Sequence, residues 1–352
     1  MKKIKKMQEA LKKEKIDYAL FINTEIKDPN IKYFTGLDLE YSFLLIPKQG
    51  DSLFLVSALE HERAKKYSII KNVKQYKKPL LEIKKIIKEK KVIGLNENYI
   101  TISTDKALKK NLKIYEQKPI QEICKAIRII KTREEINALQ KAARIADTIF
   151  VAVCKELKTN IKKYKTEKNI AEFIEQQAKK YADGISFETI VASGKNAAMP
   201  HYYPQAILLQ RGFCLLDFGV RYKNYISDIS RTIFFGAPTE EEKEAYEKVR
   251  KANKNAIEAL KIGRKCCDID ALSRKEFTYP HSLGHGIGVE VHESPSFSPK
   301  SKDVIKENMC FTIEPGMYVH HKYGIRIEDD VWMTKKGPVL LTKSTKELLC
   351  FF

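Results

Sequence analysis

The sequence predicts a two-domain protein, with an α/β domain over residues 1–130 and an α+β domain over residues 131–352. The length of 352 residues is more than one hydrophobic core usually organises. The first part alternates short apolar strands with helical patterns, whereas the second combines long amphipathic helices with hairpin patterns. A hydrophobic fraction of 43% is enough for two packed cores, so a disordered chain is not expected.

The first 130 residues are expected to form a sheet covered by helices. A helix that carries Ile4, Met7 and Leu11 on one face leads into the first strand. Further helical patterns lie at 60–67 and 80–90. The expected strands are short apolar runs at 18–22, 42–46, 53–56, 92–95 and 112–115.

The domain boundary is placed near residue 130, where a capping box begins a new helix. Thr132 is followed three residues later by Glu135, so each side chain can bond the backbone N–H of the other. The same signature at Thr239 begins a helix that runs to about Lys261. The other predicted elements are helices at 133–157 and 167–181, and strands at 186–193, 206–209, 213–220, 225–235, 309–319, 325–333 and 338–342.

A first pair of carboxylates lies on one predicted hairpin. A tight turn at Tyr222-Lys223 would place Asp217 directly opposite Asp228. Cross-strand partners have Cβ atoms about 5 Å apart, and two like charges there are destabilising unless a cation lies between them.

A second predicted hairpin repeats this arrangement. A loop centred on His321 would place Glu314 opposite Glu328. An acid beside a turn is usually only a turn residue. Two independent pairs, each flanked by apolar strand residues, instead favour metal binding.

Three histidines, His281, His285 and His292, lie between the two hairpins in the sequence. Glycines punctuate this segment and allow close approach of the backbone. One histidine with four carboxylates is an oxygen-rich donor set that suits two divalent ions. Manganese, cobalt, iron and zinc are all chemically reasonable.

At these residues the sequence resembles the pita-bread metallopeptidases, a family that includes aminopeptidase P, prolidase, methionine aminopeptidase and the non-metal relative creatinase. The matching stretches are 191–194 with Pro200-His201, 217–228, 284–288 with His292-Glu293, 314–316 and 326–329. The segment 30–36 resembles the creatinase-type N-terminal domain. Methionine aminopeptidases generally lack that domain, so the resemblance points to the Xaa-Pro-cleaving branch. The segment 268–281 looks shorter than in typical relatives, which leaves the edge of the substrate pocket open.

The resemblance implies an α/β creatinase-type N-terminal domain and an α+β pita-bread catalytic domain. It also implies an Xaa-Pro dipeptidase or Xaa-Pro aminopeptidase that acts through a hydroxide held between two divalent ions, with manganese expected. Asp217 would bind one ion, Asp228 and Glu328 would bridge both, and His285 with Glu314 would complete the second. Glu314 would also accept a proton from the attacking water.

Four further residues receive roles from the same resemblance. His201 and His292 would stabilise the tetrahedral oxyanion or protonate the leaving proline nitrogen. His281 would line the proline pocket, and Arg326 would pair either with a substrate carboxylate or with the bridging acids. The expected partner is a proline-containing di- or oligopeptide.

The formal charge of +20 keeps a function of another class open. A basic nucleic-acid- or ribosome-binding protein on a peptidase fold is the main alternative, and a methionine aminopeptidase is a weaker one. Lysines are spread over the whole chain without an aromatic-basic motif, so no specific nucleic acid is expected. No apolar run approaches the roughly 18 residues of a membrane span, and no signal peptide is recognised. The prediction is therefore a cytoplasmic protein, and the family suggests a homodimer.

Overall fold

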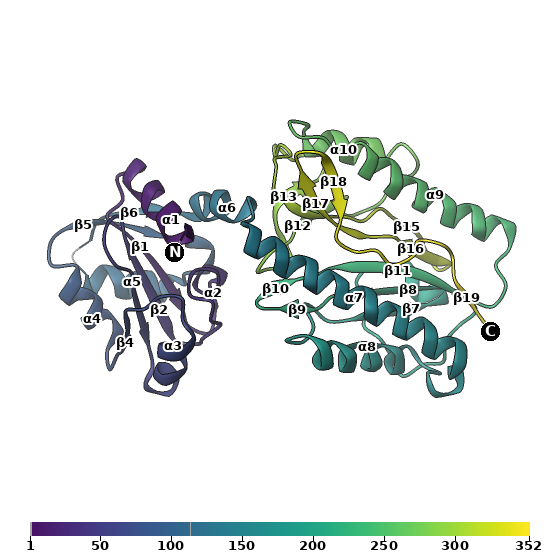
Figure 1. The fold of residues 1–352 in the computed structure, drawn as a ribbon, viewed down its shortest axis with the longest axis horizontal. Helices are drawn as coiled ribbons and strands as arrows, with labels where there is room; N and C mark the ends of the chain where they lie inside the picture. Colours follow the sequence, from purple (N-terminus) through teal and green to yellow (C-terminus); the bar gives the residue numbers. More distant parts are fainter. Residues whose placement is uncertain (1, 113) are drawn as a thin grey trace. The chain divides into compact units, whose positions relative to one another are not determined.

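The computed structural model describes residues 2–112 and 114–352. The chain divides into two compact units, one ending at Arg128 and one spanning Ile129–Phe352 (Figure 1). Among the described residues, none of the helices combines the length and the apolar character that a bilayer crossing needs.

The N-terminal unit is a six-stranded mixed sheet with the order β4-β3-β2-β1-β5-β6. Its helices are α1 (Lys2–Lys13), α2 (Pro29–Thr35), α3 (His61–Tyr67), α4 (Pro79–Ile86), α5 (Ile102–Asn111) and α6 (Gln121–Ile129). Its strands are β1 (Tyr18–Asn23), β2 (Ser42–Pro47), β3 (Leu53–Val56), β4 (Val73–Gln75), β5 (Lys91–Leu95) and β6 (Ile114–Pro119). The central strand β1 is covered on both faces, because Leu20 packs in one cluster with Ile83 of α4 while the ring of Phe21 contacts Phe34 of α2. Strand β4 and helices α2 and α5 were not predicted.

The C-terminal unit contains two main sheets and four main helices, and the sheets are antiparallel except where β19 pairs in parallel with β11. The helices are α7 (Arg133–Thr159), α8 (Glu167–Tyr181), α9 (Glu240–Glu258) and α10 (Cys266–Ser273). One sheet has the order β19-β11-β8-β7, formed by β7 (Ile190–Ser193), β8 (Gly212–Phe218), β11 (Ile229–Phe235) and β19 (Cys350–Phe351). The other has the order β13-β12-β14-β17-β18, formed by β12 (Gly284–Gly286), β13 (Glu293–Phe297), β14 (Cys310–Ile313), β17 (Asp329–Thr334) and β18 (Gly337–Leu340). Two short ladders complete the unit: β9 (Arg221–Tyr222) with β10 (Tyr225–Ile226), and β15 (Gly316–Val319) with β16 (Tyr323–Arg326).

The helices take the apolar face of each sheet and leave the other face for the site. Along β8, Leu216 and Phe218 pack in one core with residues of α7 and α8. Along β14, Phe311 packs in a second core with residues of α9 and α10. Because side chains alternate along a strand, Asp217 lies on the face of β8 that is turned away from α7 and α8.

The first hairpin differs from its predicted register. Tyr225 pairs with Tyr222, so the turn is formed by Lys223 and Asn224, which have φ values of 50° and 69°. Two successive positive φ values match a hairpin turn that favours Asn. Asp217 consequently pairs with Ser230, and the predicted direct opposition of Asp217 and Asp228 is wrong.

Three of the four carboxylates lie where the predicted continuous strands are interrupted. Asp228 separates β10 from β11, Glu314 separates β14 from β15, and Glu328 separates β16 from β17. The ladder of β14 with β17 ends at the pair Ile313 and Asp329, and the ladder of β15 with β16 ends at the pair Gly316 and Arg326. The two ladders share one register across the interruptions at Glu314 and Glu328. Glu314 and Glu328 therefore lie opposite each other, as predicted.

The predicted strand at 206–209 is also wrong. Within the described residues this segment contributes only an isolated bridge between Thr166 and Leu208. It connects β7 to β8 along the N-terminal end of α8, so its backbone bonds go to that helix end rather than to a sheet.

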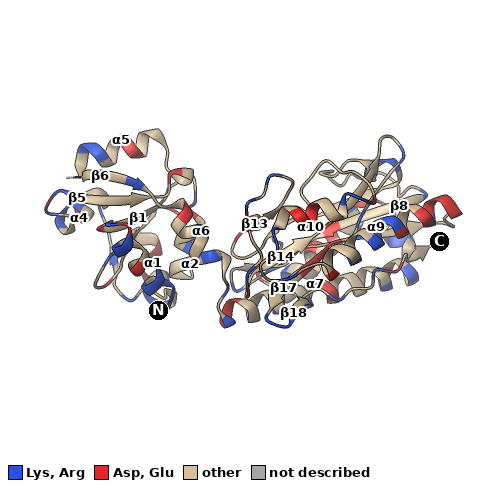
Figure 2. Cartoon of the chain, turned by 90° about the horizontal axis from the view of Figure 1, so that it is seen from above, with Lys and Arg blue, Asp and Glu red and all other residues tan. Residues whose placement is uncertain are grey.

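The positive charge is unequally divided between the two units. The sequence up to Arg128 contains 29 Lys and Arg against 16 Asp and Glu, a net charge of +13. The sequence from Ile129 onward contains 36 against 29, a net charge of +7. Lys and Arg residues occur on helices and loops of both units (Figure 2).

Candidate metal centre and substrate cavity

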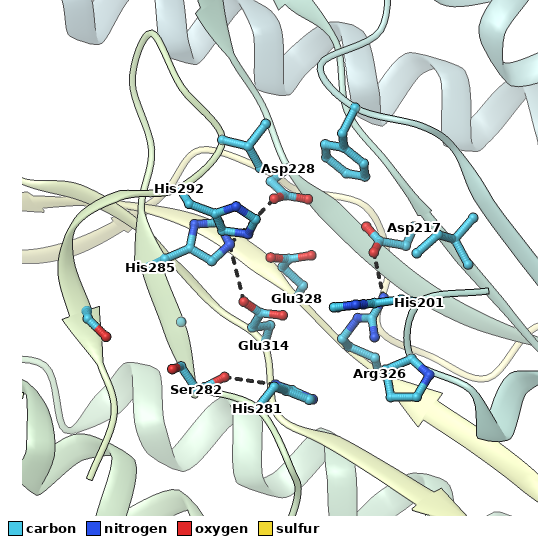
Figure 3. A pocket seen from close by; sticks show the side chains of 16 residues that line it. His201, Asp217, Asp228, His281, Ser282, His285, His292, Glu314, Arg326 and Glu328 are labelled. Carbon is cyan, nitrogen blue, oxygen red and sulfur yellow. Dashed lines mark hydrogen bonds and ion pairs between the residues drawn. The ribbon is translucent and has the colours of Figure 1, made fainter. Parts of the chain in front are cut away.

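A cavity of about 500 Å³ lies between the two sheets of the C-terminal unit (Figure 3). All nine residues singled out from the sequence line it: His201, Asp217, Asp228, His281, His285, His292, Glu314, Arg326 and Glu328. They come from both hairpins, from strand β12 and from the loops that flank β7, β12 and β13. Residues that are up to 127 positions apart in the sequence are thus brought to one place.

The most compact cluster consists of Asp228, His285 and Glu328. One ligand atom from each of these three residues lies within 4.8 Å of the others. The Nε2 atom of His285 is 3.7 Å from Oδ2 of Asp228 and 3.3 Å from Oε1 of Glu314. His285 therefore faces one carboxylate from each hairpin.

The short strand β12 places His285 beside these acids. A Cβ atom at Gly284 would lie only 2.0 Å from the carbonyl oxygen of Thr312. Only glycine permits this approach, which brings β12 against β14. The Nδ1 atom of His285 lies 3.2 Å from the carbonyl oxygen of Gly286, which can only accept a hydrogen bond. We therefore assign a proton to Nδ1, which leaves Nε2 as the atom that faces Asp228 and Glu314. Without a metal, a proton on Nε2 can be donated to Glu314, whereas a metal-binding histidine would present the Nε2 lone pair to the ion.

The acids concentrate negative charge in a buried place. Burial is the main cause that raises the pKa of Asp228 well above its usual range, and the charges of Asp217 and Asp330 raise it further. Burial, followed by the charges of Asp228 and Glu314, likewise raises the pKa of Glu328. Burial alone would also raise the pKa of Glu314, but its bond with His285 and nearby positive charge lower it.

Asp217 is held by Arg326 on one oxygen only. Nη2 of Arg326 lies 2.5 Å from Oδ2 of Asp217. Burial raises the pKa of Asp217, and the charge of Arg326 offsets part of this effect. Oδ1 of Asp217 is buried and has no hydrogen-bond partner among the described residues. A buried carboxylate oxygen normally has a partner, so this atom fits a ligand for a cation.

All three side-chain nitrogen atoms of Arg326 donate hydrogen bonds to other residues of the chain. Besides Asp217, its Nε donates to Oγ of Ser230 at 2.8 Å, and its Nη1 donates to the hydroxyl of Tyr318 at 2.6 Å. Of the two roles left open by the sequence, the geometry corresponds to pairing with an acid. The paired acid is Asp217 rather than one of the two predicted bridging residues, Asp228 and Glu328.

Two contributors were missed by sequence reasoning. Ser230 donates to Oε2 of Glu328 at 2.8 Å, so it joins that acid to Arg326. The hydroxyl of Tyr318 lies 3.0 Å from Nε2 of His281. Ser230 follows Asp228 by two positions and could have been noticed from strand periodicity, whereas Tyr318 gives no local signal.

The other histidines surround the acids at the cavity wall. The ring of His292 packs edge-on against His285, with the ring centroids 4.4 Å apart. Burial lowers the pKa of His292, and the neighbouring His285 lowers it further. Burial also lowers the pKa of His281. His201 lies on the opposite wall, beside Arg326 in Figure 3.

The donor set fits divalent cations on chemical grounds. Four carboxylates converge in one buried cavity, and Arg326 is the only Lys or Arg side chain that lines it among the described residues. Buried anions normally need paired charges or metal ions. Carboxylate oxygens with one imidazole nitrogen suit manganese, iron, cobalt or zinc.

Known proteins resemble the chain over nearly its whole length. An Xaa-Pro dipeptidase from Pyrococcus furiosus is 38% identical over 332 residues, which cover 92% of this chain and 93% of the relative. The crystal structure of the prolidase from Pyrococcus horikoshii matches with a TM-score of 0.90 and 36% identity, covering 99% of this chain and all of the other. The structure of an X-Pro aminopeptidase from Thermotoga maritima matches with a TM-score of 0.87 and 31% identity, covering 95% and 97% of the two chains.

The sequence models of two families divide the chain between them. A creatinase/prolidase N-terminal domain matches residues 3–130, and metallopeptidase family M24 matches residues 137–335. The second match contains every cavity residue singled out from the sequence, from His201 to Glu328. These matches confirm the resemblance that the motifs indicated: the chain belongs to metallopeptidase family M24, with a creatinase/prolidase-type domain preceding its peptidase domain.

Proposed function

We propose that this protein hydrolyses the Xaa-Pro bond of dipeptides with the help of two divalent metal ions, with manganese as the expected metal. The observation that carries the proposal is the convergence of four carboxylates, three of them buried and Glu314 partly buried, and one histidine on a single cavity. Among the described residues, only Arg326 supplies a fixed positive charge there. The proposed ligands are Asp217, Asp228, His285, Glu314 and Glu328.

Divalent ions held there would lower the pKa of a bound water and polarise the scissile carbonyl. The residues of the chain perform the remaining tasks. Glu314, kept anionic beside His285, accepts the proton of the attacking water. His292 and His201 stabilise the oxyanion or deliver a proton to the proline nitrogen, which cannot leave as an anion. Arg326 and Ser230 keep Asp217 and Glu328 in place.

The cavity also offers a surface that suits a proline ring. Apolar groups from Phe187, Ile190, Pro200 and Val291 line it beside the acids. A ring placed against this wall is held by apolar burial, while the polar wall faces the bond to be broken. His281, on the other side, is tied to Tyr318 and borders the same space.

The proposal is tested with Ala-Pro and Met-Pro in the presence of Mn²⁺. Asp228→Asn and Glu314→Ala are each expected to abolish hydrolysis while circular dichroism stays unchanged. Asp268→Asn, an exposed acid on α10, is the matched control and should keep full activity. Hydrolysis retained by either site variant, or by wild type after chelation, would disprove the mechanism.

A second candidate, an Xaa-Pro aminopeptidase, is supported by the likeness to the Thermotoga maritima enzyme. Comparison of Ala-Pro with Ala-Pro-Ala separates the two. Cleavage of the dipeptide alone supports a dipeptidase, and cleavage of the tripeptide supports an aminopeptidase. Metal-dependent turnover of either peptide also excludes a protein that only binds nucleic acid. A homodimer and a cytoplasmic location stay predictions, to be checked by light scattering and cell fractionation.

A further inference from the structure

We propose that Glu167 is a positioning residue, which holds the loop 193–205 so that His201 faces the metal centre. This inference rests on the proposed function, because it concerns the histidine that acts beside the metal ligands. Glu167 does not line the cavity, and no catalytic motif contains it.

Glu167 is a fully buried carboxylate at the first position of α8. The helix N-terminus favours a negative charge there. Its Oε1 accepts hydrogen bonds from the backbone N–H of Ser193 at 2.7 Å, from Oγ of Ser193 at 3.0 Å and from Nδ2 of Asn196 at 3.0 Å. Its Oε2 accepts from the backbone N–H of Gln205 at 3.4 Å. Each of these donors belongs to the loop.

The donors lie at both ends of the loop, so one carboxylate joins its beginning to its end. Ser193 closes β7, and Gln205 lies twelve positions later. A backbone bond from the N–H of Lys168 to the carbonyl of Gln205, at 3.1 Å, fixes the same end on α8. Asn196 also donates to the hydroxyl of Tyr202 at 3.1 Å, which carries the restraint to the neighbour of His201.

The beginning of the loop is also seated against the metal-binding hairpin. Its 3₁₀ turn η4 (Gly194–Ala198) packs on β16, where a Cβ atom at Gly324 would lie 1.8 Å from the carbonyl oxygen of Ala197. β16 ends at Arg326, the partner of Asp217. The side chain of His201 is itself exposed, so its position depends on the loop backbone. Glu167 restrains that backbone through its bonds to Ser193 and Gln205.

A displacement of about 1 Å in a catalytic group can lower a rate about 100-fold. We therefore expect Glu167→Ala to lower kcat for Met-Pro about 100-fold, with less than about threefold change in KM. Manganese affinity, measured by titration calorimetry, should stay within about twofold, because the proposed ligands lie on other elements. The decisive readout is a double-mutant cycle with His201→Ala. If Glu167 acts through His201, Glu167→Ala should lower kcat less than about threefold once His201 has been removed.

The controls separate positioning from general damage to the fold. Glu172→Ala removes an exposed carboxylate from the same helix and should leave kcat unchanged. Asn196→Ala removes one donor to Glu167 and should give a smaller loss of kcat in the same direction. If Glu167→Ala does not fold, Asn196→Ala replaces it in the kinetic measurements and in the double-mutant cycle with His201→Ala. Additive effects of Glu167→Ala and His201→Ala, or a parallel loss of manganese affinity, would overturn the proposal.

Hydrogen exchange provides a readout that is independent of the reaction. Glu167→Ala, without metal, should speed exchange at least tenfold for the backbone amides of Ser193 and Gln205, but not for those in β14 or β17. Unchanged exchange at both amides would overturn the restraint on the loop. If the wild type fails to cleave Xaa-Pro peptides while this exchange result holds, the proposed function is wrong, but the restraint of the loop by Glu167 is supported.

Discussion

Glu328 and Asp329 are neighbouring buried carboxylates with opposite electrostatic surroundings. Asp329 is contacted by Nη2 of Arg231 and Nζ of Lys346, each at 2.7 Å. Burial alone would raise the pKa of Asp329, but these two cations lower it. Glu328 is bonded by the neutral hydroxyl of Ser230 and faces Asp228 and Glu314, so its pKa is raised. The protein neutralises one buried acid with two of its own cations and places the next one among other carboxylates, where we propose a metal site.

The ion pair between Arg231 and Asp329 also helps to hold Glu328 in place. Arg231 donates from Nη1 to the backbone carbonyl of Glu328 and from Nη2 to Asp329. Its Nε donates to the carbonyl of Thr345 at 3.0 Å, which fixes the segment that carries Lys346. The position of Glu328 therefore depends on the ion pair beside it, and four substitutions test the contrast between the two acids.

Arg231→Met is expected to have the largest effect on stability. It leaves Asp329 buried with only Lys346 as a cation, and the loss of one partner of a buried pair costs about 3–5 kcal/mol. Urea unfolding followed by circular dichroism measures this. The double variant Arg231→Met with Asp329→Asn should recover at least half of the loss, because no buried charge is then left with a single partner. Equal stability of the single and double variants would show that Asp329 does not need Arg231.

The two acids should give opposite pH dependences in the metal-free protein. The raised pKa of Glu328 contributes stability below its unfolded value of about 4.3, and this contribution is lost as pH rises through the folded pKa. The lowered pKa of Asp329 contributes stability above about 3.9, which is lost as pH falls through its folded pKa. Glu328→Gln should therefore flatten the decline of the unfolding free energy above pH 4.3, by up to about 1.4 kcal/mol per pH unit.

Urea unfolding with a chelator between pH 3 and pH 9 measures both slopes. Asp329→Asn is the matched variant and should flatten only the acid side. A wild-type unfolding free energy that does not fall between pH 5 and pH 8, or a Glu328→Gln variant with the wild-type slope, would contradict the proposed charge imbalance. Added Mn²⁺ should reverse the slope in wild type, because the ions compete with protons for the same carboxylates.

Lys346→Met should have the smallest effect on stability. The side chain of Lys346 is 25% exposed, and Arg231 still neutralises Asp329 in its absence. The expected loss is about 1 kcal/mol, measured in the same unfolding experiment. A loss as large as that of Arg231→Met would mean that the two cations act as one unit.

Much of the fold follows from local patterns in the sequence. As predicted, the capping box at Thr132 begins α7 and the capping box at Thr239 begins α9. Helix α8 has the predicted bounds of 167–181. Glu314 and Glu328 were placed opposite each other because their loop was centred correctly at His321. Asp217 and Asp228 were misplaced because the turn was assigned to Tyr222-Lys223, although Asn224 is the better turn former.

The supporting contacts of the site could not be predicted in this way. Ser230 is 98 residues from Glu328, and Glu167 is 38 residues from Gln205. No periodicity or spacing rule joins residues at such separations, because these contacts form only in the folded chain: the first between strand β11 and the interruption that separates β16 from β17, the second between a helix end and a loop. The interruptions at Glu314 and Glu328 were missed for the same reason, since apolar residues flank each acid as they would in a continuous strand.

The strand interruptions have a consequence for how the enzyme matures. None of the five proposed ligands belongs to the two apolar cores that pack α7, α8, α9 and α10 against the sheets. The ladders on both sides of Glu314 and Glu328 are held by backbone pairing between strands, whereas small zinc domains depend on the metal itself to fold. Ions would therefore be loaded after folding, and the resident metal would be chosen by the supply of ions that the finished protein meets.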